Sequence, residues 1–94
     1  MIRSFGDGGT ERIFNGERSK KIPYEMQNVA RRKLRMIAAA KEIADLRIPP
    51  DNRLEKLLGD LAGFYSVQIN DQWRIVFSFD NGCAENVRIT DYRG

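Results

Sequence analysis

The chain has 94 residues, of which 41% are apolar and 31% are charged. Such a composition is typical of a folded soluble protein and excludes a disordered or membrane-spanning one, and the length leaves room for a single domain, residues 1–94. The net charge of +3 favours an acidic partner such as nucleic acid. A charge this small is also common in proteins that bind none, so its placement matters more than its size.

Cysteine and histidine usage narrows the chemistry. Cys83 is the only cysteine and the chain has no histidine. A lone cysteine forms no internal disulfide, and the usual metal-ligand spacings are absent. The N-terminus has no apolar run of signal-peptide length. We therefore expect a cytoplasmic protein that uses no metal or other cofactor and does not contact a membrane.

The first elements are short. Residues 2–5 alternate apolar and polar side chains, which predicts a strand at a sheet edge or beside the strand that follows the helices. The glycine-rich residues 6–9 end it. Thr10 is expected to cap the N-terminus of a short helix, which Asn15 and Gly16 end.

The main helix is predicted to begin at Pro23, because proline suits the first turn of a helix. Helical spacing is kept by the apolar residues Met26, Val29, Ala30, Leu34 and Ile37. A helix over 23–47 would be long for so small a domain, so a bend or a second helix is expected near Ala40. The basic residues on its other faces either touch phosphates or form a solvated face; they are Arg31, Arg32, Lys33 and Arg35.

Three strands are predicted in the second half, over residues 64–70, 73–79 and 85–92. The last two are joined by a turn that contains Asn81 and Gly82. Alternation points one apolar set to a common face: Tyr65, Val67, Ile69, Trp73, Ile75, Phe77, Phe79, Val87 and Ile89. Helices followed by strands indicate an α+β layer, with helices on one face of the sheet and the other face free for function.

The free face is predicted to be polar and cationic. It would carry Phe64, Ser66, Gln68, Arg74, Val76, Ser78, Asn86, Arg88, Thr90 and Tyr92. Arg74 is the first functional candidate, because a guanidinium stays charged and grips a phosphate through two parallel hydrogen bonds. The alternative is a solvent-facing arginine paired with a nearby carboxylate.

The second half of the chain resembles the HigB toxins of the RelE/ParE superfamily, in order and spacing, at 53–55 (Arg-Leu-Glu), 59–63 (Gly-Asp-Leu-Ala-Gly), 70–75 (Asn-Asp-Gln-Trp-Arg-Ile) and 91–93 (Asp-Tyr-Arg). The segments 1–5 and 45–47 are similar to that family as well. The resemblance implies a RelE-like fold, in which N-terminal helices pack on one face of a small, mainly antiparallel sheet. It also implies ribosome-dependent cleavage of mRNA. The implied partner is a HigA-like helix-turn-helix antitoxin, through which alone the chain would reach operator DNA.

The resemblance also implies roles for particular residues. Arg74 matches the family's phosphate-stabilising arginine, Tyr92 stacks a base or shares a proton, and Asp91 orients cations or acts as a base. The remaining catalytic candidates are Glu55, Lys56 and Arg93, and the expected RNA contacts are Arg53, Gln68, Ser78 and Arg88. The alternative for Glu55 is an ordinary exposed carboxylate, which is the more common case in such a segment.

The chain departs from the family at its end. Many relatives end in Asp-Tyr-His, whereas this chain ends Asp-Tyr-Arg-Gly and has no histidine. Arginine keeps its proton, so Arg93 stabilises charge but does not cycle as acid and base. Proton transfer then falls to Glu55, Lys56, Asp91, Tyr92 or the ribosome, or the activity is weak.

Two other functions stay open at this point. One is a ParE-type inhibitor of a protein target such as DNA gyrase, and the other is a ribosome-binding toxin that cleaves poorly. With Arg74 on an exposed face, Arg74→Ala is expected to abolish toxicity without unfolding the protein. With Trp73 as a buried aromatic, Trp73→Ala is expected to unfold it, at a cost of about 3–5 kcal/mol.

Overall fold

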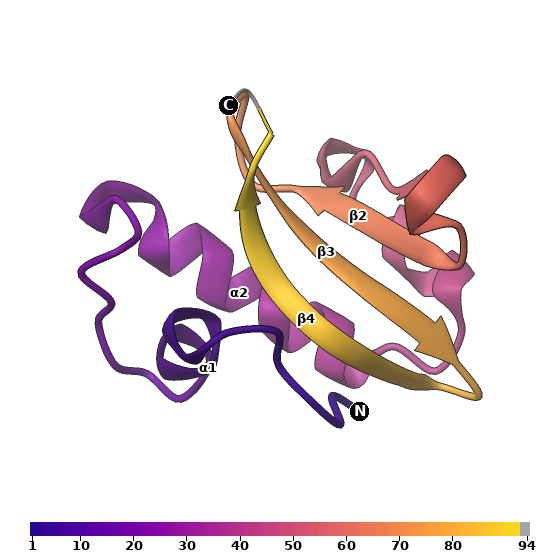
Figure 1. Ribbon diagram of the computed structural model, residues 1–94, viewed down its shortest axis with the longest axis horizontal. Coiled ribbons are helices and arrows are strands. Elements are labelled where there is room, and N and C mark those ends of the chain that lie inside the picture. Colours follow the sequence, from indigo (N-terminus) through magenta and orange to yellow (C-terminus); the bar gives the residue numbers. More distant parts are fainter. Residues whose placement is uncertain (93–94) are drawn as a thin grey trace.

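The computed structural model describes residues 1–92 and has the expected α+β architecture (Figure 1). Four antiparallel strands form one sheet in the order β1-β2-β3-β4. They are β1 (Glu55–Lys56), β2 (Phe64–Gln68), β3 (Trp73–Asp80) and β4 (Cys83–Asp91). The α-helices are α1 (Gly8–Phe14) and α2 (Gln27–Ala39), and short 3₁₀ helices are η1 (Tyr24–Met26), η2 (Ile43–Arg47), η3 (Pro50–Asn52) and η4 (Gly59–Leu61).

The N-terminal segment runs along β4, as one of the sequence-based alternatives had it. Ile2 and Phe5 form isolated parallel bridges to Ala84 and Val87. The amide of Gly6 continues this contact by donating to the carbonyl of Val87 at 2.8 Å. The segment therefore shields the outer edge of β4, which would otherwise present unpaired backbone groups.

Helix α1 begins earlier than predicted, and its cap is Asp7 rather than Thr10. The Asp7 carboxylate accepts a hydrogen bond from the amide of Thr10 at 2.7 Å. Thr10 is fully buried, and its hydroxyl accepts from the amide of Ile89 at 2.9 Å. The expected Thr10 cap was wrong because this hydroxyl is used to join α1 to β4. The predicted stop was right, since α1 ends at Phe14 with Asn15 as its C-cap.

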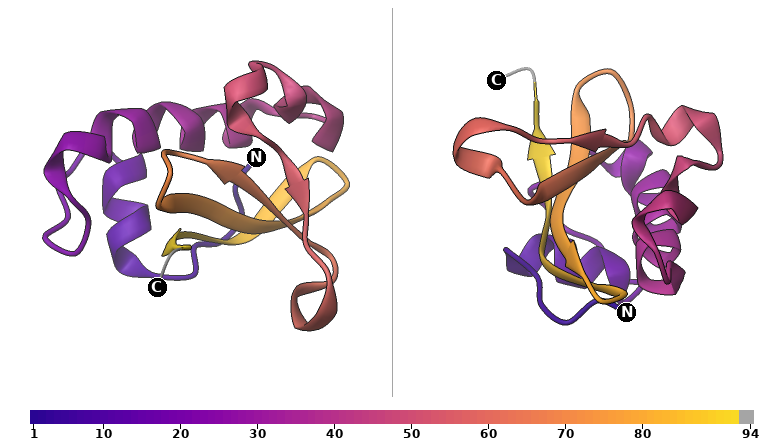
Figure 2. Two further views of the ribbon diagram at one scale, coloured as in Figure 1. Left: turned by 90° about the horizontal axis from the view of Figure 1, so that it is seen from above. Right: turned by 90° about the vertical axis from the view of Figure 1, so that its right-hand side faces the viewer.

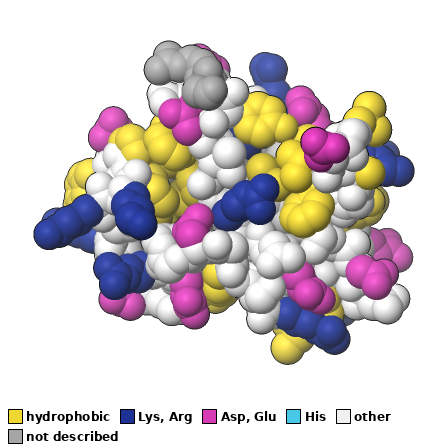
Figure 3. Space-filling view, in the orientation of Figure 1, with side chains coloured by type: hydrophobic (Ala, Val, Ile, Leu, Met, Phe, Trp, Pro, Cys, Tyr) yellow, Lys and Arg dark blue, Asp and Glu magenta, His cyan; other side chains and the backbone are white. Residues whose placement is uncertain are grey.

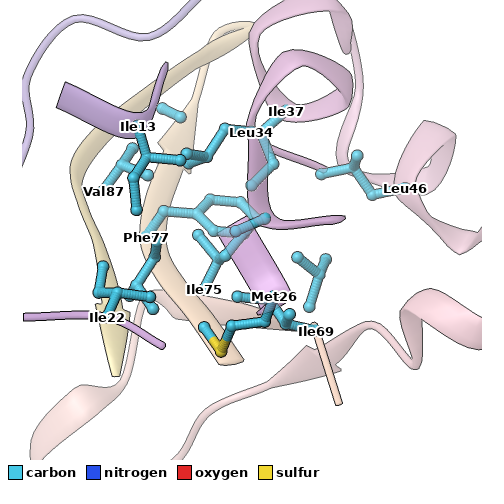
Figure 4. Packing of buried hydrophobic residues seen from close by; sticks show 14 of the residues in the cluster. Ile13, Ile22, Met26, Leu34, Ile37, Leu46, Ile69, Ile75, Phe77 and Val87 are labelled. Carbon is cyan, nitrogen blue, oxygen red and sulfur yellow. The ribbon is translucent and has the colours of Figure 1, made fainter. Parts of the chain in front are cut away.

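Helix α2 crosses one face of the sheet, and α1 packs beside it (Figure 2). It ends at Ala39 and is followed by η2, which confirms the predicted break near Ala40. Its apolar side chains meet those of the sheet in one core around Phe77, as Figure 4 shows. Each fully buried aliphatic or aromatic side chain stabilises the fold by about 1.5–3 kcal/mol. No helix in the described part of the chain is long and apolar enough to cross a membrane.

The β3–β4 hairpin turns at Asn81 and Gly82, as predicted, and the turn has only these two residues. Asn81 and Gly82 both have positive φ, at 51° and 77°, which is the geometry that Asn-Gly favours in tight hairpins. Because the turn is this short, β4 begins at Cys83, two residues before the predicted start. A register shift between Val76 and Ser78 faces Asn86, which has φ 53°. Such a bulge increases the bend of the strand, and β4 is visibly curved in Figure 1.

Candidate active site

The face of the sheet that α2 does not cover gathers most of the predicted functional residues. One cross-strand row consists of Glu55, Ser66, Val76 and Arg88, and the next consists of Gln68, Arg74 and Thr90. Residues directly opposite each other in neighbouring strands share a face. Ile75, next to Arg74, lies on the other face in the core. The predicted division of side chains between the two faces is therefore confirmed for these two rows. At the bulge it is not, because Ser78 pairs with Glu85 and not with the predicted Asn86.

Arg74 lies at the centre of this face but is buried, with only 7% of its surface exposed. Its Nε–H donates to the hydroxyl of Ser66 at 2.8 Å, and Nη2 donates to the carbonyl of Arg53 at 2.6 Å. Nη1 donates to the side-chain oxygen of Gln68 at 3.4 Å. The expectation of an exposed arginine was wrong, because the chain before β1 folds over the guanidinium and supplies an acceptor for it.

The turn that holds Arg74 is centred on Arg53, which has φ 44°. This left-handed conformation is uncommon for a residue other than glycine and persists only when its surroundings fix it. On one side, the side-chain Nδ2 of buried Asn52 donates a hydrogen bond to the carbonyl of Leu46 at 3.2 Å. On the other side, Arg74 binds the Arg53 carbonyl. The backbone at Arg53 is thus fixed from two directions while its side chain is exposed.

Strand β1 places the two catalytic candidates Glu55 and Lys56 on opposite faces. Glu55 Oε1 lies 3.9 Å from Arg74 Nη2, and its side chain is exposed. Lys56 pairs with Tyr65, which belongs to the core face, and it lines a small pocket with Ile43. The structure therefore brings Glu55 to Arg74 but does not bring Lys56 there.

Tyr92 covers Arg74 at the end of β4. The Cζ atom of Arg74 lies 5.5 Å from the centre of the Tyr92 ring, which is a cation–π distance. The Tyr92 amide donates to the carbonyl of Gln72 at 2.7 Å, so the β2–β3 turn holds this residue in place. Asp91 pairs with Trp73 on the other side of the strand, and its Oδ2 accepts from Gln72 Nε2 at 2.8 Å. Arg93 lies outside the described residues.

The predicted RNA contacts other than Arg53 differ in their burial and in the protein groups that they already contact. Arg88 is partly buried and lies over Phe64, with its Cζ atom 5.9 Å from the ring centre. Ser78 donates its hydroxyl to the carbonyl of Glu85 at 3.3 Å. Gln68 is bound to Arg74. Arg88 lies diagonally across from Arg74, two residues from the Thr90 position that pairs with it. Arg88 therefore lies on the same face as the buried Arg74, and the exposed Arg53 belongs to the turn that binds Arg74.

Lys33 supports this face from behind, a role that the sequence analysis missed. It is 2% exposed, donates from Nζ to the carbonyl of Gln68 at 2.6 Å, and lies 3.9 Å from Asp51. Burial lowers the pKa of Lys33, and the charge of Asp51 partly opposes that effect. The signal was present, because Lys33 falls on the same helical stripe as Ala30 and Ile37. Assigning it to a solvated face was wrong.

The arrangement, with buried Arg74 and the more exposed Arg53 and Arg88, suits the binding of an anion. Within residues 1–92, no group of three or more His, Cys, Asp or Glu side chains is placed to hold a metal ion. A buried, oriented guanidinium stabilises negative charge that develops nearby, and an exposed tyrosine ring offers a stacking surface for a base. The face therefore fits a phosphodiester of single-stranded nucleic acid.

Comparisons with known proteins agree with this fold. A family model described as the RelE-like toxin of the type II toxin-antitoxin system HigB matches residues 3–92. The chain belongs to this HigB-like toxin family. Toxin HigB-1 of Vibrio cholerae is 36% identical over 94 residues, which is 99% of each chain. Endoribonuclease HigB of Proteus vulgaris is 32% identical over 92 residues, covering 98% of this chain and 99% of that one.

A solved structure shares the HigB-like chain's architecture at lower identity. The YoeB-YefM complex from Staphylococcus aureus matches with a TM-score of 0.62 and 17% identity, covering 96% of this chain and 95% of that one. At that identity the match shows the fold alone. Together with the family model, it confirms the resemblance to RelE-superfamily toxins.

Proposed function

We propose that this chain is the toxin of a type II toxin-antitoxin pair and an endoribonuclease that cleaves mRNA on the ribosome. Membership in the HigB-like family and the relative named Endoribonuclease HigB support the proposal. The observation that carries it is the position of Arg74, fixed at the centre of the polar sheet face that α2 does not cover, with Tyr92 beside it. The proposed RNA-contacting residues around it are Arg53, Gln68, Ser78 and Arg88.

The proposed reaction is an internal transfer on the ribose-phosphate backbone. The 2′-hydroxyl loses its proton and attacks the phosphorus, and the 5′-oxygen leaves and takes up a proton. Negative charge grows on the phosphoryl oxygens in the transition state. Arg74 would stabilise that charge from its small exposed edge, with Arg53 and Arg88 providing further positive charge at either side.

We propose Glu55 as the base that removes the 2′-hydroxyl proton. It is exposed and lies next to Arg74 on the same face. Asp91 lies on the other side of β4 and Lys56 on the other face of β1, which makes both weaker candidates. The Tyr92 hydroxyl, Arg93 and groups of the ribosome are the remaining candidates for the leaving-group side. Arginine does not release its proton at working pH, so Arg93 would act only through its charge.

The proposed partners follow from the same function. A HigA-like helix-turn-helix antitoxin would neutralise the toxin and carry any contact with operator DNA. The ribosome would present the message as an unpaired codon, which suits the stacking of a base on Tyr92. The structural relative YoeB is described in a complex with YefM, which supports an antitoxin partner of some kind for this chain.

The test is primer extension on a defined message, with the purified protein and with or without programmed ribosomes. New 5′ ends that appear only with ribosomes are the expected result. Inhibited translation with an uncut message would contradict cleavage and favour a ribosome-binding toxin. DNA breaks that depend on gyrase would instead favour a ParE-type inhibitor. A gyrase supercoiling assay is therefore run beside the primer extension.

A further inference from the structure

A second cationic region lies away from Arg74, on the helical side of the molecule. It is an open hollow of about 1180 Å³ between the start of α1, the loop after it and the start of β3. We call it the basic groove and define it by Arg12, Arg18, Lys20, Lys21, Tyr24 and Trp73. None of the described residues that line it is an aspartate or a glutamate. Figure 3 shows basic side chains gathered over the α1–α2 connection, with acidic ones around them.

The loop that carries these cations is held in shape by a buried side chain. Gln27 is 4% exposed and accepts a hydrogen bond from the amide of Ser19. Its Nε2 donates to the carbonyls of Ser19 and Ile22, at 2.8 and 2.7 Å. The loop between these two residues contains Lys20 and Lys21, both exposed. The backbone beneath the exposed charges is therefore preorganised, which lowers the entropy cost of binding a ligand.

A second side chain of α2 fixes the other part of the connection. Arg31 donates from Nε to the carbonyl of Ile13 at 2.7 Å and from Nη2 to the carbonyl of Glu17 at 3.1 Å. These contacts satisfy backbone groups at the end of α1, where helical hydrogen bonds run out. Two side chains of α2, Gln27 and Arg31, therefore fix the segment that joins α1 to α2.

Aromatic side chains accompany the charges. Tyr24 is 64% exposed, and Arg18 lies over its ring at 4.7 Å and donates to its hydroxyl at 3.3 Å. Trp73 is only partly buried and forms part of the wall. Exposed rings beside cations are the means by which proteins hold unpaired bases and their phosphates. A carboxylate-rich peptide would use the cations but gain less from the rings.

We infer that the basic groove binds an unpaired loop of a folded RNA, separate from the strand that the Arg74 face would hold. Trp73 and Arg74 are neighbours in β3, so their side chains leave the sheet on opposite faces. A strand bound against Arg74 therefore does not fill the groove. This inference goes beyond the proposed cleavage, because it assigns a docking surface that takes no part in the chemistry.

The test compares two variants with the same change in charge. Lys20→Glu/Lys21→Glu reverses two groove charges, and Arg32→Glu/Arg35→Glu reverses two exposed charges on α2 outside the groove. The probe is a fluorescein-labelled RNA hairpin with an unpaired loop, measured by anisotropy at several salt concentrations without ribosomes. The groove variant should bind at least about tenfold more weakly, with a salt slope lower by about two, and the α2 variant should change less than about threefold.

Further arms separate stacking from charge. Tyr24→Ala should weaken binding of the hairpin by about tenfold, and Tyr24→Phe should keep it, because only the ring is needed for stacking. Equal losses in the two charge variants would overturn the inference, since they would show a general charge effect. Tighter binding of a glutamate-rich peptide than of the hairpin, lost in the groove variant, would overturn it in favour of an acidic protein. Cleavage is not measured, so failure here is distinct from failure of the proposed function.

Discussion

The Arg74 face and the basic groove both concentrate positive charge, but they use it in opposite ways. On the Arg74 face the central charge is buried, and the Ser66 hydroxyl and the Arg53 carbonyl accept hydrogen bonds from it. In the groove the charges are exposed, and neutral Gln27 orders the backbone beneath them. A buried charge orders the chain around it because leaving its partners unpaired is costly. An exposed charge stays available to a ligand. Mutation of Arg74 should therefore lower stability as well as activity, whereas loss of an exposed charge in the groove should mainly weaken binding.

Arg74→Ala should have the largest effect and should damage both cleavage and stability. It leaves the Ser66 hydroxyl and the Arg53 carbonyl without their donor, which we expect to lower the free energy of unfolding by about 3 kcal/mol. This replaces the sequence-based expectation of an intact fold. Urea unfolding, followed by circular dichroism, measures the loss. An unfolding free energy within about 0.5 kcal/mol of the parent would contradict the burial of this residue.

Gln27→Leu should have an intermediate effect, confined to the groove. It keeps the side-chain volume but leaves the Ser19 and Ile22 carbonyls unpaired, at a cost of about 2 kcal/mol. Hydrogen exchange should accelerate at the Ser19 amide, which also loses its acceptor. The amides of β1 and β2 should lose only the protection that the lower global stability accounts for. Binding of the RNA hairpin should weaken although no cation has been removed. Unchanged binding would show that the loop needs no preorganisation.

Asp45→Ala should have the smallest effect and gives a reference outside both regions. Backbone hydrogen bonds from Glu42 and Lys41 lower the pKa of Asp45, whose carboxylate forms part of the capping box at the start of η2. A carboxyl pKa that is lower in the folded state stabilises the protein above its ordinary value of 3.8 and loses that contribution as the pH falls through the lowered value. The variant should therefore melt slightly lower at neutral pH, with a deficit that shrinks in acid. A deficit that grows as the pH falls would contradict this cap.

Local patterns in the sequence were enough to divide most of the sheet into two faces, except at the bulge in β4, where Glu85 pairs with Ser78. Alternation placed Ile75 in the core and Arg74 opposite it, because each strand residue turns to the other face from its neighbour. The Asn81-Gly82 turn and the end of α2 also follow from local conformational preferences. Such features depend on residues that are close in the chain.

The burial of individual side chains could not be predicted in the same way. Arg74 is covered because the turn at Arg53, 21 residues earlier, folds back over it. Trp73 was expected to be buried but is only partly so, since the loop before η1 leaves a hollow beside it. Its replacement by alanine should therefore cost less than the loss of a fully buried aromatic. Both outcomes depend on contacts between distant segments, for which alternation carries no signal.

The most direct test of the central claim is the rate of message cleavage on programmed ribosomes by variants that remove exposed charge from the Arg74 face. Arg53→Gly is suited to this, because glycine readily adopts the left-handed conformation of this position and keeps the carbonyl that binds Arg74. Combined with Arg88→Gln, it should lower the single-turnover rate by at least about a hundredfold, which corresponds to about 2.7 kcal/mol of transition-state stabilisation, with the fold intact. Arg32→Ala/Arg35→Ala, on the exposed side of α2, should stay within about twofold of the parent. A folded Arg53→Gly/Arg88→Gln protein that cleaves at the parent rate would show that the message is cut elsewhere.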